Sequence, residues 1–371
     1  LESLLNVEQG RYWSLKLSAR ATGAALPPIQ TIDLRGQPLR HGLSKTLTDT
    51  LPAHLARREQ APLFLNRRGY SPTLWCHHCG LLAGCPRCDA RLTFHAGNQR
   101  LRCHHCGTEQ VLMPSCPDCG STALRALGQG TERIEEALAE MFPTVGVIRI
   151  DRDSTRRKGA MQAMLDSIHN GEKQLLVGTQ MLAKGHHFPS VTLVGILDAD
   201  QGLFGADFRA SERMAQLIIQ VAGRAGRADK PGQVLLQTYH PEHPLLRSLL
   251  TEGYAAFAAQ ALRERREAEL PPYTAMAILR AEATDRDRPL GFLSKAYELA
   301  SGLADASVEL LGPLPAPMER RAGRFRAQLL LQAPQRGPLQ HLLTAWLPAL
   351  DELAEGRKVR WSIDVDPTDT L

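Results

Sequence analysis

The sequence predicts an α/β protein: a parallel-sheet lobe is interrupted by a cysteine-rich insert and followed by a smaller α+β domain. Three observations lead to this prediction. Short apolar segments alternate with amphipathic segments up to about residue 240, all eight cysteines lie between Cys76 and Cys119, and the segment order becomes βαββαβ after about residue 270. At about 150 residues per domain, 371 residues provide two or three domains.

The composition is that of a globular protein, with 43% hydrophobic and 22% charged residues. It excludes a chain that is mainly disordered, collagen-like or coiled-coil. The net charge of +5 is mild, so it permits an anionic partner without demanding one. No run of about 18 apolar residues and no signal peptide occur, so we expect a cytoplasmic protein without a membrane partner. Since the first residue is Leu1, we expect the chain to begin inside a longer protein.

The lobe is predicted from apolar residues at helical spacing and from short continuous apolar strands. Before the insert we expect strands over 31–34 and 62–66 and a helix over 42–57. After it we expect helices over 132–141, 155–169 and 209–222, and strands over 145–150, 174–177, 192–197 and 233–238. Continuous apolar strands alternating with helices indicate a parallel sheet covered on both faces.

The last hundred residues predict a ferredoxin-like or related split βαβ unit. We expect strands over 276–283, 308–311, 325–333 and 359–365, with helices over 290–304 and 339–353. Pro271-Pro272 marks the boundary. The predicted division is the end of a preceding lobe or a lead-in (1–40), the lobe (41–75 and 121–240), the insert (76–120), a helical connector (241–270) and the C-terminal domain (271–371).

The cysteines form four CxxC pairs, which begin at Cys76, Cys85, Cys103 and Cys116. One CxxC turn points two thiolates at a cation, and two such turns complete a tetrahedral zinc site, so we expect two zinc ions. The 14 residues between Cys88 and Cys103 suit a zinc ribbon with a hairpin turning at Gly97-Asn98. This spacing favours nested pairing, with sequential and interleaved pairing as alternatives. Reducing conditions make disulfides the weaker interpretation, and an iron–sulfur cluster is also less favoured.

The segment QVAGRAGR (220–227) ends an amphipathic helix. Gly223 and Gly226 allow close backbone approach, and Arg224 and Arg227 have the spacing to clamp a nucleotide phosphate together. Gln220 opens the motif and is the third candidate catalytic residue. The alternative is a pair of surface arginines on a loop.

The segment VGTQMLAKGHHFP (177–189) leaves a predicted strand at its carboxyl end, where ligands of parallel sheets gather. Thr179, Gln180 and Lys184 are candidates for contacts to a nucleic-acid backbone, and Gly185 permits a tight turn. The alternative is an ordinary strand-to-helix loop. Asp198 and Asp200 end the next strand.

A third segment, GQGT (128–131), places Thr131 as a helix N-cap behind glycine amides that are free for an anion; plain capping is the alternative. The sequence contains no GxxxxGK[ST] phosphate loop and no DExH-type acidic pair after an apolar strand. The chain therefore has candidate arginine fingers without a nucleotide cradle.

Taken together, GTQMLAKGHHFP, QVAGRAGR, FLNRRGY (64–70), the eight-cysteine insert and IDVDP (363–367) resemble the primosomal replication-restart DNA helicases of superfamily 2. The resemblance covers the whole chain and implies a RecA-like helicase lobe 2, a two-zinc insert and the C-terminal domain. The family's phosphate-loop and DEAH lobe is absent from this sequence. We therefore expect no ATPase activity from the chain alone.

The resemblance implies an ATP- and Mg²⁺-dependent 3′-to-5′ DNA translocase that restarts replication at stalled forks and assembles the primosome at the bacterial nucleoid. It implies one zinc on Cys76, Cys79, Cys116 and Cys119 and another on Cys85, Cys88, Cys103 and Cys106. Arg224 and Arg227 would face ATP held by the first lobe, and Thr179 to Lys184 would couple DNA contact to hydrolysis.

Arg320, Arg321, Arg324 and Arg326 would contact forked DNA, with a solvated basic loop as the alternative. Arg336 and Gln340 would contact the acidic tail of single-stranded-DNA-binding protein, which the family engages. Two other functions remain as alternatives: a non-catalytic zinc module that binds DNA or protein, and a generic RNA helicase, against which the insert argues.

Overall fold

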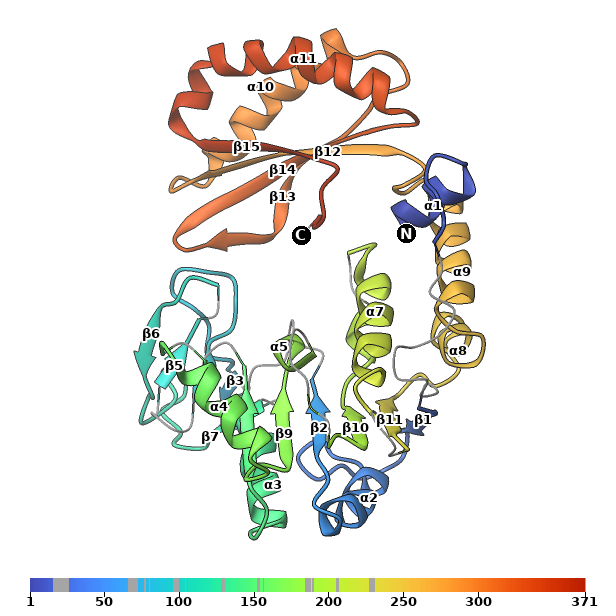
Figure 1. The fold of residues 1–371 in the computed structure, drawn as a ribbon. Coiled ribbons are helices and arrows are strands. Elements are labelled where there is room, and N and C mark those ends of the chain that lie inside the picture. The colour runs from blue at the N-terminus through green and yellow to red at the C-terminus, as the bar shows by residue number, and fades with distance from the viewer. Residues whose placement is uncertain are drawn as a thin grey trace. The chain divides into compact units, whose positions relative to one another are not determined.

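The computed structural model describes residues 1–15, 27–65, 73–76, 78–79, 81–95, 100–103, 105–127, 131–151, 154–155, 157–183, 188, 190–204, 207–226 and 231–370. The chain forms two compact units, whose elements are labelled in Figure 1. One unit comprises residues 12–71 and 128–261. The other comprises residues 1–11, 72–127 and 262–371.

The first unit is built on a six-stranded sheet whose order is β1-β11-β10-β2-β9-β8. Its strands are β1 (Ile29–Asp33), β2 (Ala61–Phe64), β8 (Val147–Ile150), β9 (Leu175–Gly178), β10 (Leu193–Ile196) and β11 (Gln233–Thr238). Every neighbouring pair is parallel, which confirms the predicted sheet type. Residues 29–33, within the segment predicted as the end of a preceding lobe or a lead-in, form a strand that pairs along β11.

The helices of this lobe are α2 (Lys45–Ala56), α3 (Thr131–Met141), α4 (Ala160–His169), α5 (Gln180–Ala183), α6 (Asp200–Leu203), α7 (Ala210–Ala222) and α8 (Pro244–Thr251), and α9 (Tyr254–Glu267) follows. Leu47 of α2 and Ile134 of α3 pack in one core with Leu63 of β2. Side chains of the other sheet face, such as Val194, are buried as well, as expected for a doubly covered parallel sheet.

Helix α4 begins five residues later than its predicted start at residue 155. Gly159 adopts a left-handed conformation with φ 83°, which a right-handed helix cannot continue through. At the start of α2, by contrast, the side chain of Ser44 accepts a hydrogen bond from the Leu47 amide at 3.3 Å. That contact satisfies one of the amides left free at a helix start.

The cysteine-rich insert contains a five-stranded sheet in the order β6-β5-β4-β3-β7. Its antiparallel strands are β3 (Thr73–Cys76), β4 (Thr93–His95), β5 (Arg100–Arg102), β6 (Glu109–Val111) and β7 (Leu124–Leu127). Strands β4 and β5 form the hairpin that the ribbon interpretation requires. Its predicted turn, Gly97-Asn98, lies outside the described residues.

The C-terminal domain has the predicted βαββαβ order, with its sheet arranged β13-β14-β12-β15. It comprises β12 (Ala275–Ala283), α10 (Asp287–Leu303), β13 (Glu309–Arg321), β14 (Arg324–Ala333), α11 (Arg336–Glu352), the 3₁₀ helix η2 (Ala354–Lys358) and β15 (Arg360–Val365). All paired strands are antiparallel, as in a ferredoxin-like unit. Helix α1 (Glu2–Glu8) also belongs to this unit.

Strand β13 extends ten residues beyond its predicted end at residue 311. The extension was not predicted because it contains Pro313, Pro315 and Pro317. Proline cannot donate a hydrogen bond to a neighbouring strand, so it normally argues against a strand. Strand β13 is at the edge of the sheet, where proline is tolerated, and its register with β14 shifts twice along this stretch. The two strands therefore form a long hairpin that ends at residues 320–324.

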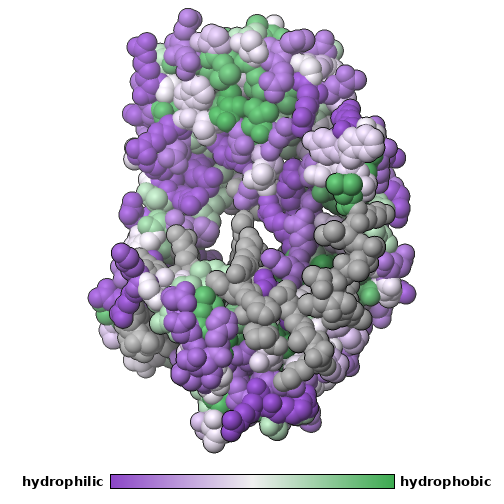
Figure 2. Space-filling view, viewed as in Figure 1, coloured by the Kyte–Doolittle hydropathy of each residue, from purple (hydrophilic) through white to green (hydrophobic). Residues whose placement is uncertain are grey.

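Helices α10 and α11 pack on one face of this sheet around Trp346 and Phe292, which are fully buried. In Figure 2, hydrophobic residues also gather on the surface over these helices. Leu303 of α10 and Leu347 of α11 are exposed. Among the helices that the described residues form, none has both the length and the apolarity needed to cross a bilayer.

Trp346 provides a test of this core. Its Nε1 donates to the carbonyl of Ala296 at 3.0 Å and thereby joins α11 to α10. Trp346→Ala should lower the free energy of unfolding by about 3–5 kcal/mol because it leaves a cavity and an unpaired carbonyl. Leu347→Ala, at the exposed neighbour, is the control and should change it by less than about 0.5 kcal/mol. Urea denaturation followed by circular dichroism measures both, and equal losses would contradict this core assignment.

Candidate functional site

Each CxxC pair lies in a tight turn, which we call a knuckle. In every knuckle the amide of the first cysteine donates to the carbonyl five residues later. The four bonds are Cys76 to Leu81 (2.8 Å), Cys85 to Ala90 (2.9 Å), Cys103 to Thr108 (2.8 Å) and Cys116 to Ser121 (2.8 Å). This shared geometry places both sulfur atoms of a knuckle on one side, as a metal requires.

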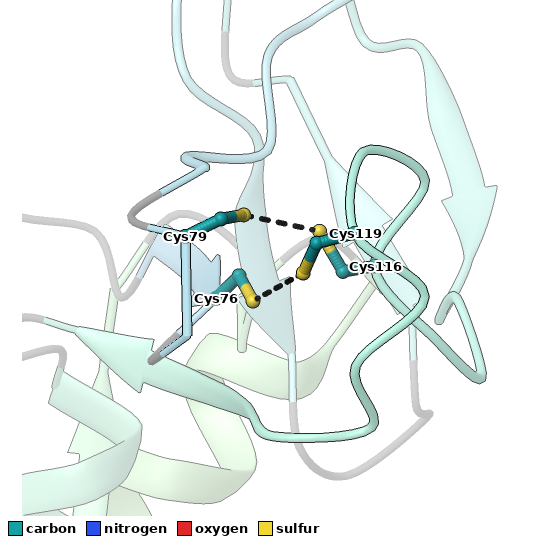
Figure 3. A group of neighbouring side chains, drawn as sticks. All are labelled: Cys76, Cys79, Cys116 and Cys119. Atoms are coloured by element: carbon teal, nitrogen blue, oxygen red, sulfur yellow. Dashed lines mark hydrogen bonds between the residues drawn. The ribbon is translucent and has the colours of Figure 1, made fainter.

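The knuckles meet in two groups of four cysteines, in which the Sγ atoms all lie within 4.8 Å of one another. The outer cluster is Cys76, Cys79, Cys116 and Cys119 (Figure 3), and the inner cluster is Cys85, Cys88, Cys103 and Cys106. The nested pairing is thus the one that the structure adopts.

The geometry of both clusters fits zinc. The Sγ atoms of Cys76 and Cys119 are 3.6 Å apart, and those of Cys85 and Cys106 are 3.7 Å apart. A tetrahedron with zinc–sulfur bonds of about 2.3 Å requires about 3.8 Å between sulfur atoms. A disulfide requires about 2.05 Å, and all eight cysteines are free. With four thiolates on each ion, both sites would be closed, as in structural zinc centres.

Backbone amides favour the thiolate form of cysteines in both clusters, as at Cys76 and Cys106. Hydrogen bonds from backbone amides, chiefly that of Cys79, lower the pKa of the Cys76 thiol to about 6. Burial raises the pKa of Cys88 in the inner cluster to about 12, although the backbone amide of Ala322 opposes this rise. A bound cation would supply the positive charge that a buried thiolate needs.

The arginine–glycine motif follows α7 directly. Gln220 is exposed near the end of the helix, Gly223 ends it, and Arg224 is half-buried in the turn that follows. Gly226 has φ 67°, and its amide donates to the carbonyl of Val191 at 3.2 Å, so the turn is anchored beside the start of β10. Arg227 lies outside the described residues.

Gly232 is a residue of this site that the sequence interpretation missed. A Cβ atom there would lie 2.3 Å from the amide nitrogen of Gly226 and 2.5 Å from the carbonyl carbon of Ala225. The start of β11 therefore packs directly on the backbone of the arginine turn. The sequence signal was the Pro231-Gly232 pair before a strand, which by itself indicates only a turn.

Thr179 lies, half-buried, at the carboxyl end of β9, as predicted, and α5 begins at Gln180. Gly178 before it comes so close to β8 that a Cβ would lie 2.6 Å from the carbonyl oxygen of Ile150. Lys184 and Gly185 lie outside the described residues. Helix α5 packs against α7, so the GTQ segment and the helix that carries the arginine motif are neighbours in one lobe.

Two other predicted features have structural partners. Thr131 is the first residue of α3, and its hydroxyl donates to Asp151 at 2.7 Å. The glycines at 128 and 130, whose amides were predicted to be free for an anion, lie outside the described residues. Asp200 accepts hydrogen bonds from the hydroxyl of Thr238 and from the amide of Tyr239, and it thereby joins the ends of β10 and β11.

The four arginines of the C-terminal hairpin differ in their surroundings. Arg320 contacts Asp89 of the insert, and Arg324 lies 3.7 Å from Glu282 of β12. Arg321 is exposed. Burial, together with the nearby charge of Arg321, lowers the pKa of the Arg326 guanidinium.

Arg336 and Gln340 lie one turn apart on α11, and both are exposed. The Arg336 guanidinium forms an ion pair with Asp366 at 3.0 Å, where its side chain remains 78% exposed. The pair is therefore accessible to an acidic ligand that would compete with Asp366.

Comparison with known families defines the class of the lobe. Residues 127–229 match the family described as the helicase conserved C-terminal domain. The parallel-sheet lobe with its arginine turn thus corresponds to a helicase C-terminal domain. Two other matches are to families with more specific descriptions: residues 85–110 match the Cys-rich region of PriA DNA helicase, and residues 266–368 match the C-terminal domain of primosomal protein N.

The chain belongs to the family of the replication restart protein PriA. It is 49% identical over 369 residues to that protein of Haemophilus influenzae, with 100% of this chain and 50% of the relative covered. It is 38% identical over 371 residues to the Bacillus subtilis protein (99% and 46% covered) and 42% identical over 328 residues to the Synechocystis protein (86% and 39% covered). The chain spans about half the length of these curated relatives or less.

The zinc assignment predicts a stoichiometry. The purified chain should hold two zinc ions, and Cys103→Ser should hold one, because it removes a ligand of the inner cluster alone. Elemental analysis and native mass spectrometry measure the count, with Ser121→Ala beside the outer cluster as a control that keeps both ions. A wild-type chain with fewer than two zinc ions would contradict the assignment.

The close packing of Gly232 predicts that alanine will destabilise the protein at this position but not at an open glycine position. Gly232→Ala should destabilise the lobe by about 1–3 kcal/mol, because its Cβ overlaps backbone atoms that cannot move independently. Gly291→Ala, in α10 with nothing within 4 Å of its added Cβ, should be neutral or stabilising by up to about 1 kcal/mol. Denaturant unfolding of the two variants tests this, and a neutral Gly232→Ala would refute the tight contact.

Proposed function

We propose that this chain is the second motor lobe, zinc insert and C-terminal domain of an ATP-dependent 3′-to-5′ DNA helicase that restarts replication and assembles the primosome at stalled forks. The observation that carries the proposal is the arginine turn at residues 223–226. It follows the long helix of a helicase-type lobe in a chain of the PriA family. The lobe would act on a nucleotide held by a facing lobe, since the sequence contains no phosphate loop.

In this proposal Arg224 and Arg227 stabilise the negative charge that develops on the transferred phosphoryl group of Mg-ATP. Gln220 would orient groups beside them, and Gly223 and Gly226 let the backbone come close to the nucleotide. The anchoring of Gly226 to Val191 and the packing of Gly232 support this role, because a charged finger acts efficiently only when its position is fixed beforehand.

Thr179, Gln180 and Lys184 would contact the phosphates of single-stranded DNA, with Gly185 forming the turn between DNA contact and nucleotide site. In the C-terminal domain, Arg321 and Arg326 suit a DNA backbone best. Arg321 is close enough to disfavour the charge of Arg326, and a phosphate would relieve this repulsion. Arg320 and Arg324, which we also proposed for DNA, have carboxylate partners within the protein.

Arg336 and Gln340 would bind the acidic tail of single-stranded-DNA-binding protein on the exposed surface of α11. We place this activity, with the other primosome proteins, in the bacterial cytoplasm at the nucleoid. The exposed Arg336 supports a carboxylate-binding role, because its present partner is a single surface aspartate.

The arginine fingers have a direct test in a longer protein that joins this chain to a phosphate-loop lobe. Arg224→Ala and Arg227→Ala should each lower DNA-stimulated ATP hydrolysis by about 10³-fold or more and leave DNA affinity within about threefold. Arg247→Ala, at an exposed position of α8, is the matched control and should leave DNA-stimulated ATP hydrolysis unchanged. Turnover unchanged in the finger variants would refute the role.

The chain alone provides the complementary measurement. We expect no ATP hydrolysis above background from the 371 residues, with or without DNA. Measurable turnover would reveal a nucleotide site in this chain and contradict the proposed division of labour between lobes. If the longer protein also lacked ATPase activity, the result would favour a non-catalytic zinc-dependent adaptor that binds DNA or protein.

A further inference from the structure

We infer that the turn between β13 and β14 is a structural part of the inner zinc cluster. Zinc at this cluster and the docking of the C-terminal hairpin then stabilise each other. The inference rests on zinc binding by the inner cluster, not on helicase activity. The insert and the hairpin belong to the same compact unit of the chain.

The first observation is a difference between knuckles. In three of them a glycine follows the second cysteine, and one of these glycines, Gly80, lies outside the described residues. In the other two, the glycine amide closes the turn on the carbonyl of the first cysteine. Gly107 donates to Cys103 at 2.8 Å, and Gly120 donates to Cys116 at 2.9 Å. In the knuckle that begins at Cys85, this position is Asp89, and its amide donates instead to the carbonyl of Arg320 at 2.9 Å.

The knuckle at Cys85 lacks the closing hydrogen bond to the carbonyl of its first cysteine, and the hairpin supplies another donor to that carbonyl. The guanidinium of Arg320 donates to the carbonyl of Cys85, the acceptor that corresponds to Cys103 and Cys116, at 3.4 Å. The amide of Arg320 donates in turn to the carboxylate of Asp89. Asp89 and Arg320 thus exchange backbone and side-chain hydrogen bonds, and the knuckle is completed by residues more than 200 positions away in the chain.

A second set of contacts reaches a zinc ligand directly. The amide of Ala322 donates to the Sγ atom of Cys88 at 3.0 Å. Beside it, the amide of Gly323 donates to the carbonyl of Arg87 at 2.7 Å, and the Arg87 guanidinium donates to the carbonyl of Ala322 at 3.0 Å. An amide that points at a ligating sulfur stabilises its thiolate form, and such supporting contacts typically change metal affinity by about 10–100-fold.

The conformation of the turn agrees with this role. Ala322 and Gly323 have φ values of 54° and 78°, so both central residues of the two-residue turn are left-handed. Asparagine, aspartate or glycine is the usual first residue of such a turn, and alanine is disfavoured there. An alanine held in this conformation indicates that surrounding contacts determine the backbone, and the contacts present are those to Arg87 and Cys88.

The coupling must be reciprocal. If the hairpin raises the affinity of the inner cluster for zinc by a given factor, zinc raises the stability of the docked hairpin by the same factor. The outer cluster serves as an internal control within the same molecule, because the hydrogen bonds from residues 320–323 described above end on the knuckle at 85–89.

The test shortens the hairpin by two residue pairs, Arg320–Phe325 and Arg321–Arg324, and keeps Ala322-Gly323 as the turn. The turn then withdraws by about 7 Å without reversing which face of the sheet each strand residue occupies. The zinc-loaded full chain is placed in EDTA with iodoacetamide. Mass spectrometry of the alkylated peptides follows Cys88 for the inner cluster and Cys116 for the outer cluster.

We expect alkylation at Cys88 to be about tenfold faster in the shortened chain and alkylation at Cys116 to be unchanged. Asp89→Gly in the shortened chain restores the self-closing knuckle and should slow Cys88 alkylation toward the wild-type rate. Cys88 rates equal to wild type in the shortened chain would overturn the inference. Equal acceleration at both cysteines would also overturn it, since the effect would then be general unfolding.

The wild-type chain provides a second, variant-free measurement. Removing zinc should increase amide hydrogen exchange at residues 318–325, while exchange at β12 in the same domain stays unchanged. If removing zinc leaves the rate of amide hydrogen exchange at the hairpin unchanged, the reciprocal part of the inference is overturned. Neither measurement involves ATP or DNA, so failure here is distinguishable from failure of the proposed helicase function.

Discussion

The insert depends on the requirement that four thiolates surround one cation. Its strands are three or four residues long, and its apolar core is formed by a few side chains such as Leu74, Leu92 and Leu101. A core of this size rarely stabilises a fold without metals or cross-links. Two tetrahedral zinc sites would provide the missing cross-links, and the outer one would join Cys76 to Cys119 across the whole insert. The sheet register and the face offered to the C-terminal hairpin follow from this constraint.

In the lobe, the constraint is that a sheet buried on both faces leaves few positions for polar side chains. Its strands are apolar on both faces, so reactive groups are confined to strand ends and to the turns that follow. Glycines make these ends compact: Gly178 lies against β8, and Gly232 lies against the arginine turn. The positions of Thr179 and Arg224 are therefore determined by backbone contacts, and a substitution that adds one carbon atom would disturb them.

Much of this architecture was predictable from local patterns. Apolar periodicity identified the sheet and most helices, and CxxC spacing together with the ribbon hairpin identified the nested clusters. The errors have physical causes. Gly159 shortened α4 through its own conformation, and prolines in β13 looked like a strand end because edge position cannot be read locally. The pairing of β1 with β11 and the partners of Arg320 join residues far apart in the chain, so no local pattern could reveal them. The contact of Gly232 with Ala225 and Gly226 is closer in the chain, but the Pro231-Gly232 pair specifies only a turn and not the close approach of two backbone segments.

The replacement of a glycine by Asp89 also has a consequence for the order in which the protein matures. The outer cluster has all its ligands once Cys119 has left the ribosome, but the partner of Cys88 lies 234 residues further along the chain. At about 5–20 residues per second, synthesis of that stretch takes roughly 10–50 s. During this interval the inner knuckle is exposed to solvent without its closing contacts. The inner cluster therefore gains these contacts later in biosynthesis than the outer cluster gains its ligands, once the C-terminal domain has been made.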